Sequence, residues 1–266
     1  MKTTIAASLA LAATLSATAL ASADAAPSTH PAEHARAGAY RVSATVNKTE
    51  LLLNSVVKIR AKVFPAAPGA EVTLQVKYED RKSWKTIDRG RLSNAGKVIF
   101  KDKVGSVRER RYRVVKPADA GHGAGQGTAP RVTVFGWRDL TSLSPATFNT
   151  MSEVDTSNIN GVAYPQSLRA YLNYHSPSSA LTDYNLNRDC KAFRGVVGLD
   201  DTSPEAATAT IRLSTDGIQR YSGSFALTQA APVTFDVTQV FRLSLSATSN
   251  GSAVAAVGHP QVLCSF

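Results

Sequence analysis

The spacing of the side chains in this chain that could perform catalysis matches no common catalytic motif. The sequence has 5 histidines, but neither a Gly-x-Ser-x-Gly nucleophile elbow nor a His-Glu-x-x-His zinc motif. Two carboxylates could still meet in the folded chain, as glycosidases require. Both domains expected below are small sandwiches that their own cores would fill. We therefore expect no enzymatic activity.

Two pairs of residues have a pattern that suits a metal ion. His30 and His34 are spaced like ligands on a helix, but helix signals are poor there and no carboxylate or cysteine cluster accompanies them. Asp200 and Asp201 follow an apolar run. Their carboxylates would either cap the loop with hydrogen bonds or hold a structural calcium ion. We expect no cofactor, with this calcium as the open alternative.

Residues 1–25 have the features of a secretory signal peptide. A lysine precedes an apolar run from Ile5 to Leu20, and small-residue cleavage sites end at Ala23 and Ala25. No later segment approaches the roughly 20 apolar residues that a membrane span requires. These features predict a secreted, extracellular protein without a transmembrane segment. Residues 26–39 lack periodicity and are expected to form a flexible lead.

The chain has two cysteines, Cys190 and Cys264. Because an exported chain meets an oxidising environment, a single disulfide is the simplest expectation. It would close a loop of about 75 residues and contribute roughly 4 kcal/mol on the chain-entropy model. It would also fix the last strand to the strand that begins at Cys190.

Positive charge is concentrated in the first half of the chain. The formal net charge is +10, with 20 basic and 8 acidic residues in 39–131 but 8 basic and 10 acidic residues in 132–266. This asymmetry favours contact of the first half with an anionic polymer and of the second half with something uncharged. The alternative is that the charge only keeps an exported protein in solution.

Short runs with strand alternation fill residues 40–118, separated by turn signals at the spacing of about 8 to 12 residues that is typical of sandwich folds. The run 56–64 has an apolar face and a face carrying Lys58, Arg60 and Lys62. With Trp84-Lys85-Thr86 and a last strand ending Tyr112-Arg113-Val114-Val115, this stretch resembles the immunoglobulin-like modules of secreted actinobacterial proteins. The resemblance implies an immunoglobulin-like β-sandwich.

The densest basic cluster lies around the last of these strands, where alternation would place several of its members on one face. Its members are Arg108, Arg110, Arg111, Arg113 and Lys116. A nucleic-acid site would need interleaved aromatic residues, and Tyr112 has the opposite parity. We expect no nucleic-acid partner; an anionic cell-wall polymer and a solvated strand face remain open.

Residues 119–131 are rich in glycine and have no apolar pattern. Glycine-rich loops that bind phosphate lead into a helix, whereas this stretch leads into the strand-like run 131–135. It is expected to be an interdomain linker, or else a long hairpin loop. The second domain would then span 132–266.

The second half also alternates as strands do. Phe193, Val197 and Leu199 share one face with Gly195, whereas Arg194, Val196 and Gly198 share the other, and Asp216-Gly217 marks a tight hairpin. Several half-buried antiparallel strands must pack against a second sheet. A two-layer β-sandwich is the economical architecture.

An ordered set of short motifs runs through residues 136–266. The motifs are Trp137-Arg138-Asp139-Leu140, Asn160-Gly161-Val162-Ala163-Tyr164, His175-Ser176-Pro177-Ser178-Ser179, Tyr184-Asn185-Leu186, Val197-Gly198-Leu199-Asp200-Asp201 and Phe241-Arg242-Leu243. In this order they resemble the NPCBM family, a carbohydrate-binding module also found attached to glycoside hydrolases. The resemblance implies a galactose-binding-like jelly roll, so the whole chain is expected to be all-β with two sandwich domains.

The candidate sugar-binding residues are taken from predicted loops, because sugar recognition combines an aromatic face with a few fixed polar groups. They are Tyr174, His175, Asp200, Arg220 and Tyr221. The chain departs from the family near its end: many members carry a tryptophan, a small residue and an acidic residue where this sequence has Gly258-His259-Pro260-Gln261.

Together these patterns predict a secreted, non-catalytic bacterial protein. Its C-terminal module would recognise a glycan or cell-wall polysaccharide, and its basic N-terminal module would act as a spacer or as a contact to anionic cell wall. The alternative is a structural or protein-interaction role for a sandwich that has lost its sugar site.

Overall fold

The structure is a computed structural model that describes residues 38–119, 121–146, 150–173 and 178–266. The predicted signal peptide lies outside these ranges. Nearly all regular structure within them is β-strand, apart from the short 3-10 helix η1 (Leu140–Ser142). The all-β prediction is confirmed. No described helix has the length and apolar character needed to span a membrane.

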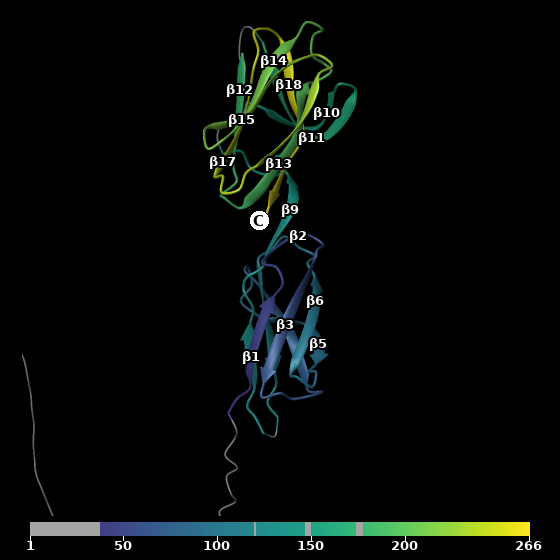
Figure 1. The fold of residues 1–266 in the computed structure, drawn as a ribbon. Coiled ribbons are helices and arrows are strands. Elements are labelled where there is room, and N and C mark those ends of the chain that lie inside the picture. The colour runs from purple at the N-terminus through teal and green to yellow at the C-terminus, as the bar shows by residue number, and fades with distance from the viewer. Residues whose placement is uncertain (1–37, 120, 147–149, 174–177) are drawn as a thin grey trace, which may run out of the picture. The chain divides into compact units, whose positions relative to one another are not determined.

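The N-terminal sandwich consists of two sheets (Figure 1). One sheet has the order β1 (Arg41–Val46), β3 (Val56–Phe64) and β6 (Lys97–Lys103). The other has the order β5 (Lys85–Arg91), β4 (Glu71–Tyr78), β7 (Arg110–Lys116) and β8 (Gly125–Thr128). Alternate apolar residues of β3, β4 and β7, including Ile59, Leu74 and Tyr112, form the buried core. The immunoglobulin-like character of this sandwich stays a prediction.

The Gly-rich stretch 119–131 is part of this sandwich and not a free linker. Residues 125–128 form β8, which pairs antiparallel with β7. A side chain at Gly125 or Gly127 would collide with backbone atoms of Tyr40 and Val42. The glycines therefore allow close approach of two backbones, an effect that composition alone does not distinguish from linker flexibility.

The N-terminal core also includes Ala129, at the end of the Gly-rich stretch, and Val132 and Val134, which follow it. Val134 belongs to β9 (Thr133–Asp139), whose first residues pair parallel with β2 (Glu50–Leu52). The last residues of β9, from Gly136 onward, instead pair antiparallel with β18 (Ala253–Cys264). One strand thus contributes to both sandwiches.

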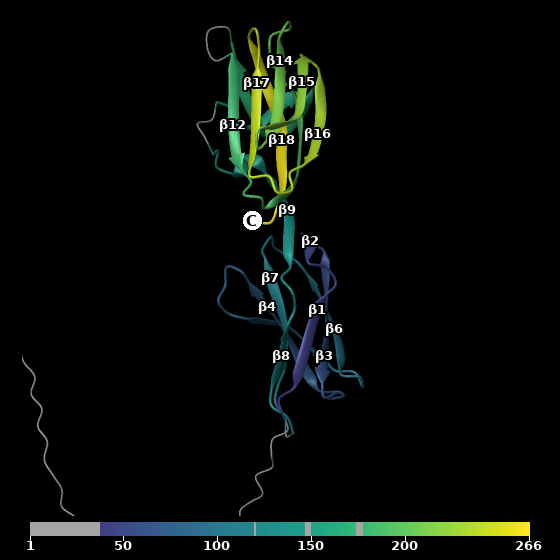
Figure 2. The same ribbon diagram turned by 60° about the vertical axis from the view of Figure 1, so that its left-hand side comes forward.

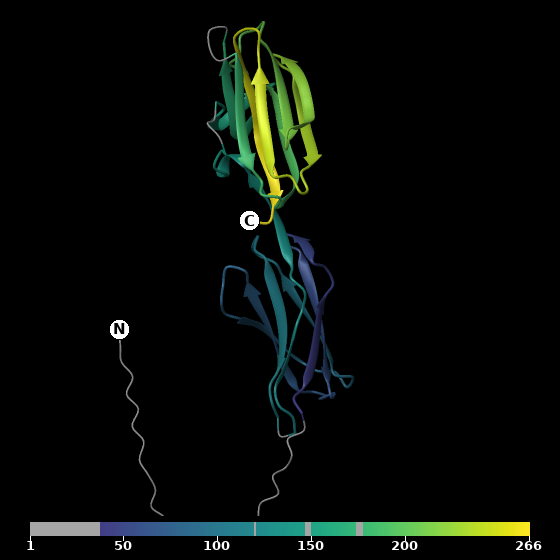
Figure 3. The same cartoon turned by 90° about the vertical axis from the view of Figure 1, so that its left-hand side faces the viewer.

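The C-terminal sandwich also has two sheets (Figures 2 and 3). One, here called the first sheet, runs in the order β10 (Ser152–Ile159), β11 (Val162–Leu172), β18, β13 (Cys190–Leu199) and β16 (Ala230–Asp236). The second runs in the order β12 (Ser179–Asn185), β17 (Arg242–Thr248), β14 (Thr208–Thr215) and β15 (Ile218–Ala226). Phe193, Val197 and Leu199 are fully buried between the sheets, which confirms the predicted inward face of β13.

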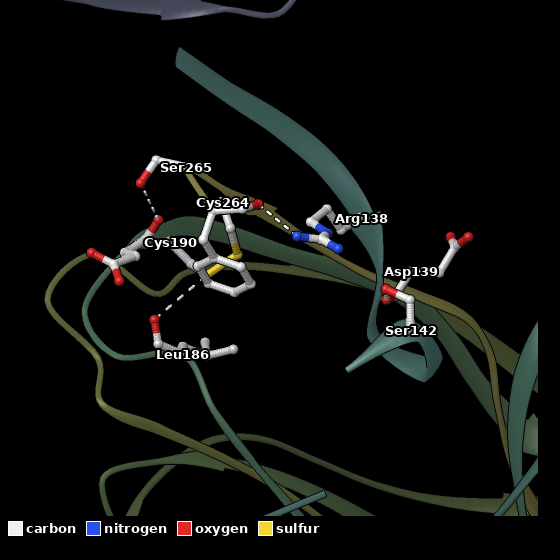
Figure 4. Close-up of a disulfide and its surroundings, with 9 residues drawn as sticks. Arg138, Asp139, Ser142, Leu186, Cys190, Cys264 and Ser265 are labelled. Atoms are coloured by element: carbon white, nitrogen blue, oxygen red, sulfur yellow. Dashed lines mark hydrogen bonds between the residues drawn. A yellow bond between two sulfur atoms is a disulfide. The ribbon is translucent and has the colours of Figure 1, made fainter. Parts of the chain in front are cut away.

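The predicted disulfide joins Cys190 to Cys264, 74 residues apart, and both cysteines are buried (Figure 4). It ties the start of β13 to the end of β18, where the two residues are direct cross-strand partners. Around it, the Arg138 guanidinium donates to the carbonyl oxygen of Phe266 at 2.6 Å, and the Ser265 hydroxyl donates to the carbonyl oxygen of Asp189 at 3.2 Å. The end of the chain is thereby fixed to the sandwich.

Candidate functional site

The predicted sugar-binding residues do not form one site. Tyr174 and His175 lie outside the described residues. Asp200 follows β13 at the end of the first sheet and bridges to Ile159, whereas Arg220 and Tyr221 lie on β15 in the second sheet.

Asp200 is a structural residue with 1% of its surface exposed. Its carboxylate accepts hydrogen bonds from Ser157 Oγ and, at 2.6 Å, from Thr202 Oγ1, and it lies 3.4 Å from the Arg169 guanidinium. Burial opposes ionisation, but these hydrogen bonds and the nearby charge outweigh it and hold the pKa of Asp200 below its usual value. A buried, fully engaged carboxylate has no oxygen to offer a sugar.

Loop capping also accounts for Asp201, whose Oδ2 accepts the backbone N–H of Gly161 at 2.9 Å. The described ranges contain no group of three or more His, Cys, Asp or Glu side chains placed to hold a metal ion. Of the two alternatives for this carboxylate pair, the hydrogen-bonding role is the one with direct contacts.

The two candidates on β15 are also engaged within the sandwich. Arg220 is exposed, and its Nε donates to Thr215 Oγ1 at 2.6 Å. Tyr221 is half-buried and packs against the C-terminal core. Neither contributes to a hollow found in the C-terminal sandwich.

A hollow of about 280 Å³ lies instead on the outer face of the first sheet, across β11, β18, β13 and β16. We call it the outer-face hollow. Its lining includes Tyr164, Arg194, Thr234, Gly258, His259 and Gln261. Arg194 points outward because Phe193 and Val197 point inward from the same strand.

A β-bulge shapes the floor of the hollow. Arg194 opposes Gln261 and Val196 opposes Gly258, so the single residue Gly195 faces the two residues between them on β18. One of these two, His259, has a φ of +45°, which is uncommon for a residue with a side chain. Bulges bend a strand and redirect side chains, and they often lie beside binding sites. Here the bulge places His259 on the outer face with Gln261.

Four polar side chains from three strands hold one another in the hollow and at its rim. Asp139 Oδ1 accepts the Gln261 side-chain amide at 2.7 Å and lies 3.1 Å from His259 Nε2. Gln261 Oε1 in turn accepts two hydrogen bonds from Arg194, at 2.8 and 2.6 Å. The orientations of the carboxylate, the imidazole, the amide and the guanidinium are therefore set before any ligand arrives.

Two aromatic side chains adjoin this network. The Arg194 guanidinium carbon lies 4.0 Å from the ring centroid of Trp137, which remains 38% exposed. Tyr164 lies directly against Gly258, where an added Cβ would come within 2.6 Å of its ring. Gly258 is therefore needed to let the tyrosine ring rest on the strand.

The hollow uses residues that sequence reasoning had placed in motifs without assigning them a role. Trp137, Asp139 and Tyr164 belong to the ordered NPCBM-like motifs, and Gly258 to Gln261 were treated as a departure that could remove a sugar site. The outward parity of Arg194 was visible in the sequence. The bulge that joins these residues was not.

A protein-family comparison supports the family resemblance of the C-terminal domain. Residues 138–257 match the family model of the NPCBM/NEW2 domain, so the C-terminal part of the chain carries such a domain. The match includes Asp139, Tyr164 and Arg194 and ends before Gly258. No curated protein sequence matches the chain.

Solved structures give weaker similarities. The CBM51 from Clostridium perfringens GH95 in complex with methyl-galactose is 14% identical, with a TM-score of 0.40, and the alignment covers 47% of this chain and 99% of that one. A PKD domain from human KIAA0319 is 16% identical, with a TM-score of 0.25 and coverage of 41% and 92%.

Proposed function

We propose that this is a secreted, non-catalytic protein whose C-terminal sandwich binds an uncharged carbohydrate in the outer-face hollow. The observation that carries the proposal is the combination of exposed aromatic surface at Trp137 with a prearranged set of donors and acceptors centred on Asp139 and Gln261. Sugars have apolar ring faces and hydroxyl edges, and both kinds of group are matched here. The NPCBM/NEW2 domain supports the same class of ligand.

The unused hydrogen-bonding capacity of the network suits hydroxyl groups. Among the described residues, Asp139 Oδ2 and His259 Nδ1 make no hydrogen bond, while their partner atoms Oδ1 and Nε2 hold them in position. Separate sugar hydroxyls can donate to the carboxylate oxygen and bond with the imidazole nitrogen. Arg194 and Asp139 balance one another in charge, which favours a neutral ligand.

The same arrangement argues against glycoside hydrolysis. A glycosidase needs two carboxyl groups flanking the bond that breaks. The described residues that line the hollow include no carboxylate, and at its rim two neighbours already hold Oδ1 of Asp139. Binding without bond cleavage is the activity that these groups support.

The test is a survey of neutral mono- and oligosaccharides with the full chain, with and without calcium, followed by titration of the best ligand against Trp137→Ala. We expect the affinity to fall about fivefold or more, because packing of a sugar ring against an aromatic face contributes about 1 kcal/mol or more. Trp84→Ala is the matched control. Trp84 also lies under an arginine, Arg113 at 4.4 Å, but in the other sandwich.

Failure of every neutral glycan to bind at millimolar concentration would refute the proposal and favour the alternative, a sandwich that contacts protein. An equal loss in both tryptophan variants would also count against this hollow. Circular dichroism of each variant establishes that the sandwiches remain folded.

A further inference from the structure

The N-terminal sandwich carries a second outer surface whose polar groups are arranged quite differently. It is the outward face of the β1-β3-β6 sheet, and we call it the cationic face. Its basic residues are Arg41, Lys58, Arg60, Lys62, Lys97, Lys101 and Lys103. All of them are exposed, because the alternate residues of these strands point into the core or toward it.

No counter-ion from the described chain accompanies these cations. None of them takes part in any of the ion pairs found among the described residues. The outward positions of the three strands include no acidic residue. The one carboxylate within them, Asp102 on β6, has the opposite parity and accepts the buried Tyr112 hydroxyl at 2.7 Å.

Like charges stand directly opposite one another on this face. Lys58 pairs in register with Lys101, and Lys62 pairs with Lys97. Like charges directly opposite one another on neighbouring strands are destabilising. The arrangement costs stability in the free protein, and an anion lying across the strands would relieve it.

The basic cluster expected on β7 is divided between the two sides of that strand: Arg111 and Arg113 share outward positions, whereas Arg110 and Lys116 lie at buried positions. Arg110 is buried and donates to the carbonyl oxygen of Ser106 at 2.6 Å. Lys116 is buried and donates to the carbonyl oxygen of Pro117 at 2.9 Å. The two side chains fold inward because backbone acceptors lie within reach. On the cationic face, by contrast, all seven basic side chains are exposed.

A hollow of about 270 Å³ lies in the middle of the cationic face. It brings together cations, hydroxyls and apolar residues: Arg60, Lys62, Lys97, Ser43, Thr45, Ala61, Val98 and Ile99. Ile99 is 59% exposed, unusually open for an isoleucine in a strand. A sugar ring could rest on it while its hydroxyls meet Ser43 and Thr45 and its charged group meets the cations.

We infer that the cationic face binds an anionic polysaccharide, a chain of sugars bearing regularly spaced carboxylates or phosphates. The mixed lining of its hollow favours sugars over a bare polyanion. Nucleic acid fits less well, because bases need open aromatic surfaces for stacking. Phe64 is the one aromatic residue at the outward positions of these strands. It is 55% exposed, with the Arg41 guanidinium carbon 4.9 Å from its ring centroid, and a strand of stacked bases needs several such rings. The inference is independent of the outer-face hollow and does not rest on the proposed function above.

The experiment measures binding of the full chain to polygalacturonate, to a phosphodiester-linked polysaccharide, to neutral dextran and to single-stranded DNA. The test variant is Lys58→Gln/Arg60→Gln/Lys62→Gln, at three outward positions of β3. The control variant is Arg81→Gln/Lys82→Gln/Lys85→Gln, which removes the same charge from exposed positions elsewhere in this sandwich.

We expect at least tenfold weaker binding of one or both anionic polysaccharides by the test variant, and less than a twofold change in the control. The comparison of polygalacturonate with the phosphodiester polymer shows which anion is preferred. Binding should also weaken steeply between low and high salt, since exposed charges are screened.

Three results would overturn the inference. Equal losses in the two variants would show that net charge and not this face is responsible. Tighter binding of DNA than of either polysaccharide would assign the face to nucleic acid. Absence of binding to both anionic polysaccharides at low salt would leave the face without this role.

Discussion

The outer-face hollow and the cationic face are both built from outward residues of a sheet, yet they treat polar groups in opposite ways. In the hollow, Asp139, His259, Gln261 and Arg194 are bonded to one another. On the cationic face the charged side chains have no ionic partner among the described residues. The first surface is preorganised for short-range contacts, and the second presents unsatisfied charge.

Strand regularity accounts for the difference. The β1-β3 and β3-β6 ladders keep one register throughout, so outward positions repeat about every 7 Å along a strand and about 5 Å across strands, and cations occupy most of those on β3 and β6. The β13-β18 ladder is interrupted by a bulge, which gathers unlike groups at one point. A regular ladder suits a repeating polymer, whereas a bulge suits a compact ligand.

The largest effect should come from removing the disulfide, because the hollow rests on the two strands that it joins. Cys190→Ala/Cys264→Ala should lower the free energy of unfolding of the C-terminal sandwich by about 4 kcal/mol, given the long loop that the bond closes. The N-terminal sandwich has a separate core and should keep its stability.

Denaturant unfolding can follow the two sandwiches separately, because each contains one of the 2 tryptophans, Trp84 and Trp137. Variants that retain only one tryptophan assign each transition. In the disulfide variant, a denaturant concentration that unfolds only the C-terminal sandwich should abolish glycan binding and leave polyanion binding intact. A parallel shift of both transitions would break the distinction between the two surfaces.

Local alternation made much of the fold predictable from the sequence. The inward set of β13 and the split of β3 into apolar and cationic faces follow from a period of two, which needs no knowledge of distant partners. The disulfide was predictable because the chain has only 2 cysteines. These features depend on composition and on neighbours in the sequence.

The sites depend on neighbours in space, and there the sequence was a poor guide. Trp137, Arg194 and Gln261 come from three strands, and a bulge sets their alignment. The inward orientation of the Arg110 side chain depends on a backbone acceptor, the Ser106 carbonyl oxygen, which no sequence motif predicts. Asp200 looked like a loop ligand because burial by Ser157 and Thr202 could not be inferred from alternation.

A smaller loss of stability is expected at Asp200, without an effect on ligand binding in the outer-face hollow. Asp200→Asn should destabilise the C-terminal sandwich by about 2 kcal/mol at pH 7, because it weakens charge-assisted hydrogen bonds and leaves Arg169 without its anion. Glycan affinity should stay within twofold of the parent protein. A large loss of glycan affinity with unchanged stability would show that Asp200 is a glycan-binding residue after all.

The stability that Asp200 contributes should decrease as the pH is lowered. Burial raises the pKa of Asp200, but the bonds from Ser157 and Thr202 lower it further, so the folded pKa lies below the unfolded one. The carboxylate therefore contributes stability above about pH 4, its unfolded pKa, and loses it as the pH falls through the folded pKa. The gap between parent and Asn variant, measured by denaturant unfolding, should shrink from pH 7 to pH 3. Asp155→Asn, at an exposed position of β10, should show no such gap.

The smallest effect, and the most selective, should come from Asp139→Ala. Without this carboxylate, Gln261 and His259 lose their shared acceptor, and the preorganisation of the hollow is lost. We expect about tenfold weaker glycan binding, or about 1.4 kcal/mol. Asp139→Asn should recover much of it, because an amide oxygen can still accept from Gln261. Asp155→Ala removes a carboxylate from the same sheet outside the hollow and should have no effect.

Titration calorimetry of glycan and of polyanion binding by the Asp139 variants tests whether the two surfaces are independent. Asp139→Ala removes one negative charge, so a ligand held by net charge alone would bind it slightly better. A ligand held by the prearranged network would bind it worse. Weaker glycan binding with unchanged or stronger polyanion binding is therefore the pattern that two independent surfaces require, and parallel changes would show that one surface serves both ligands.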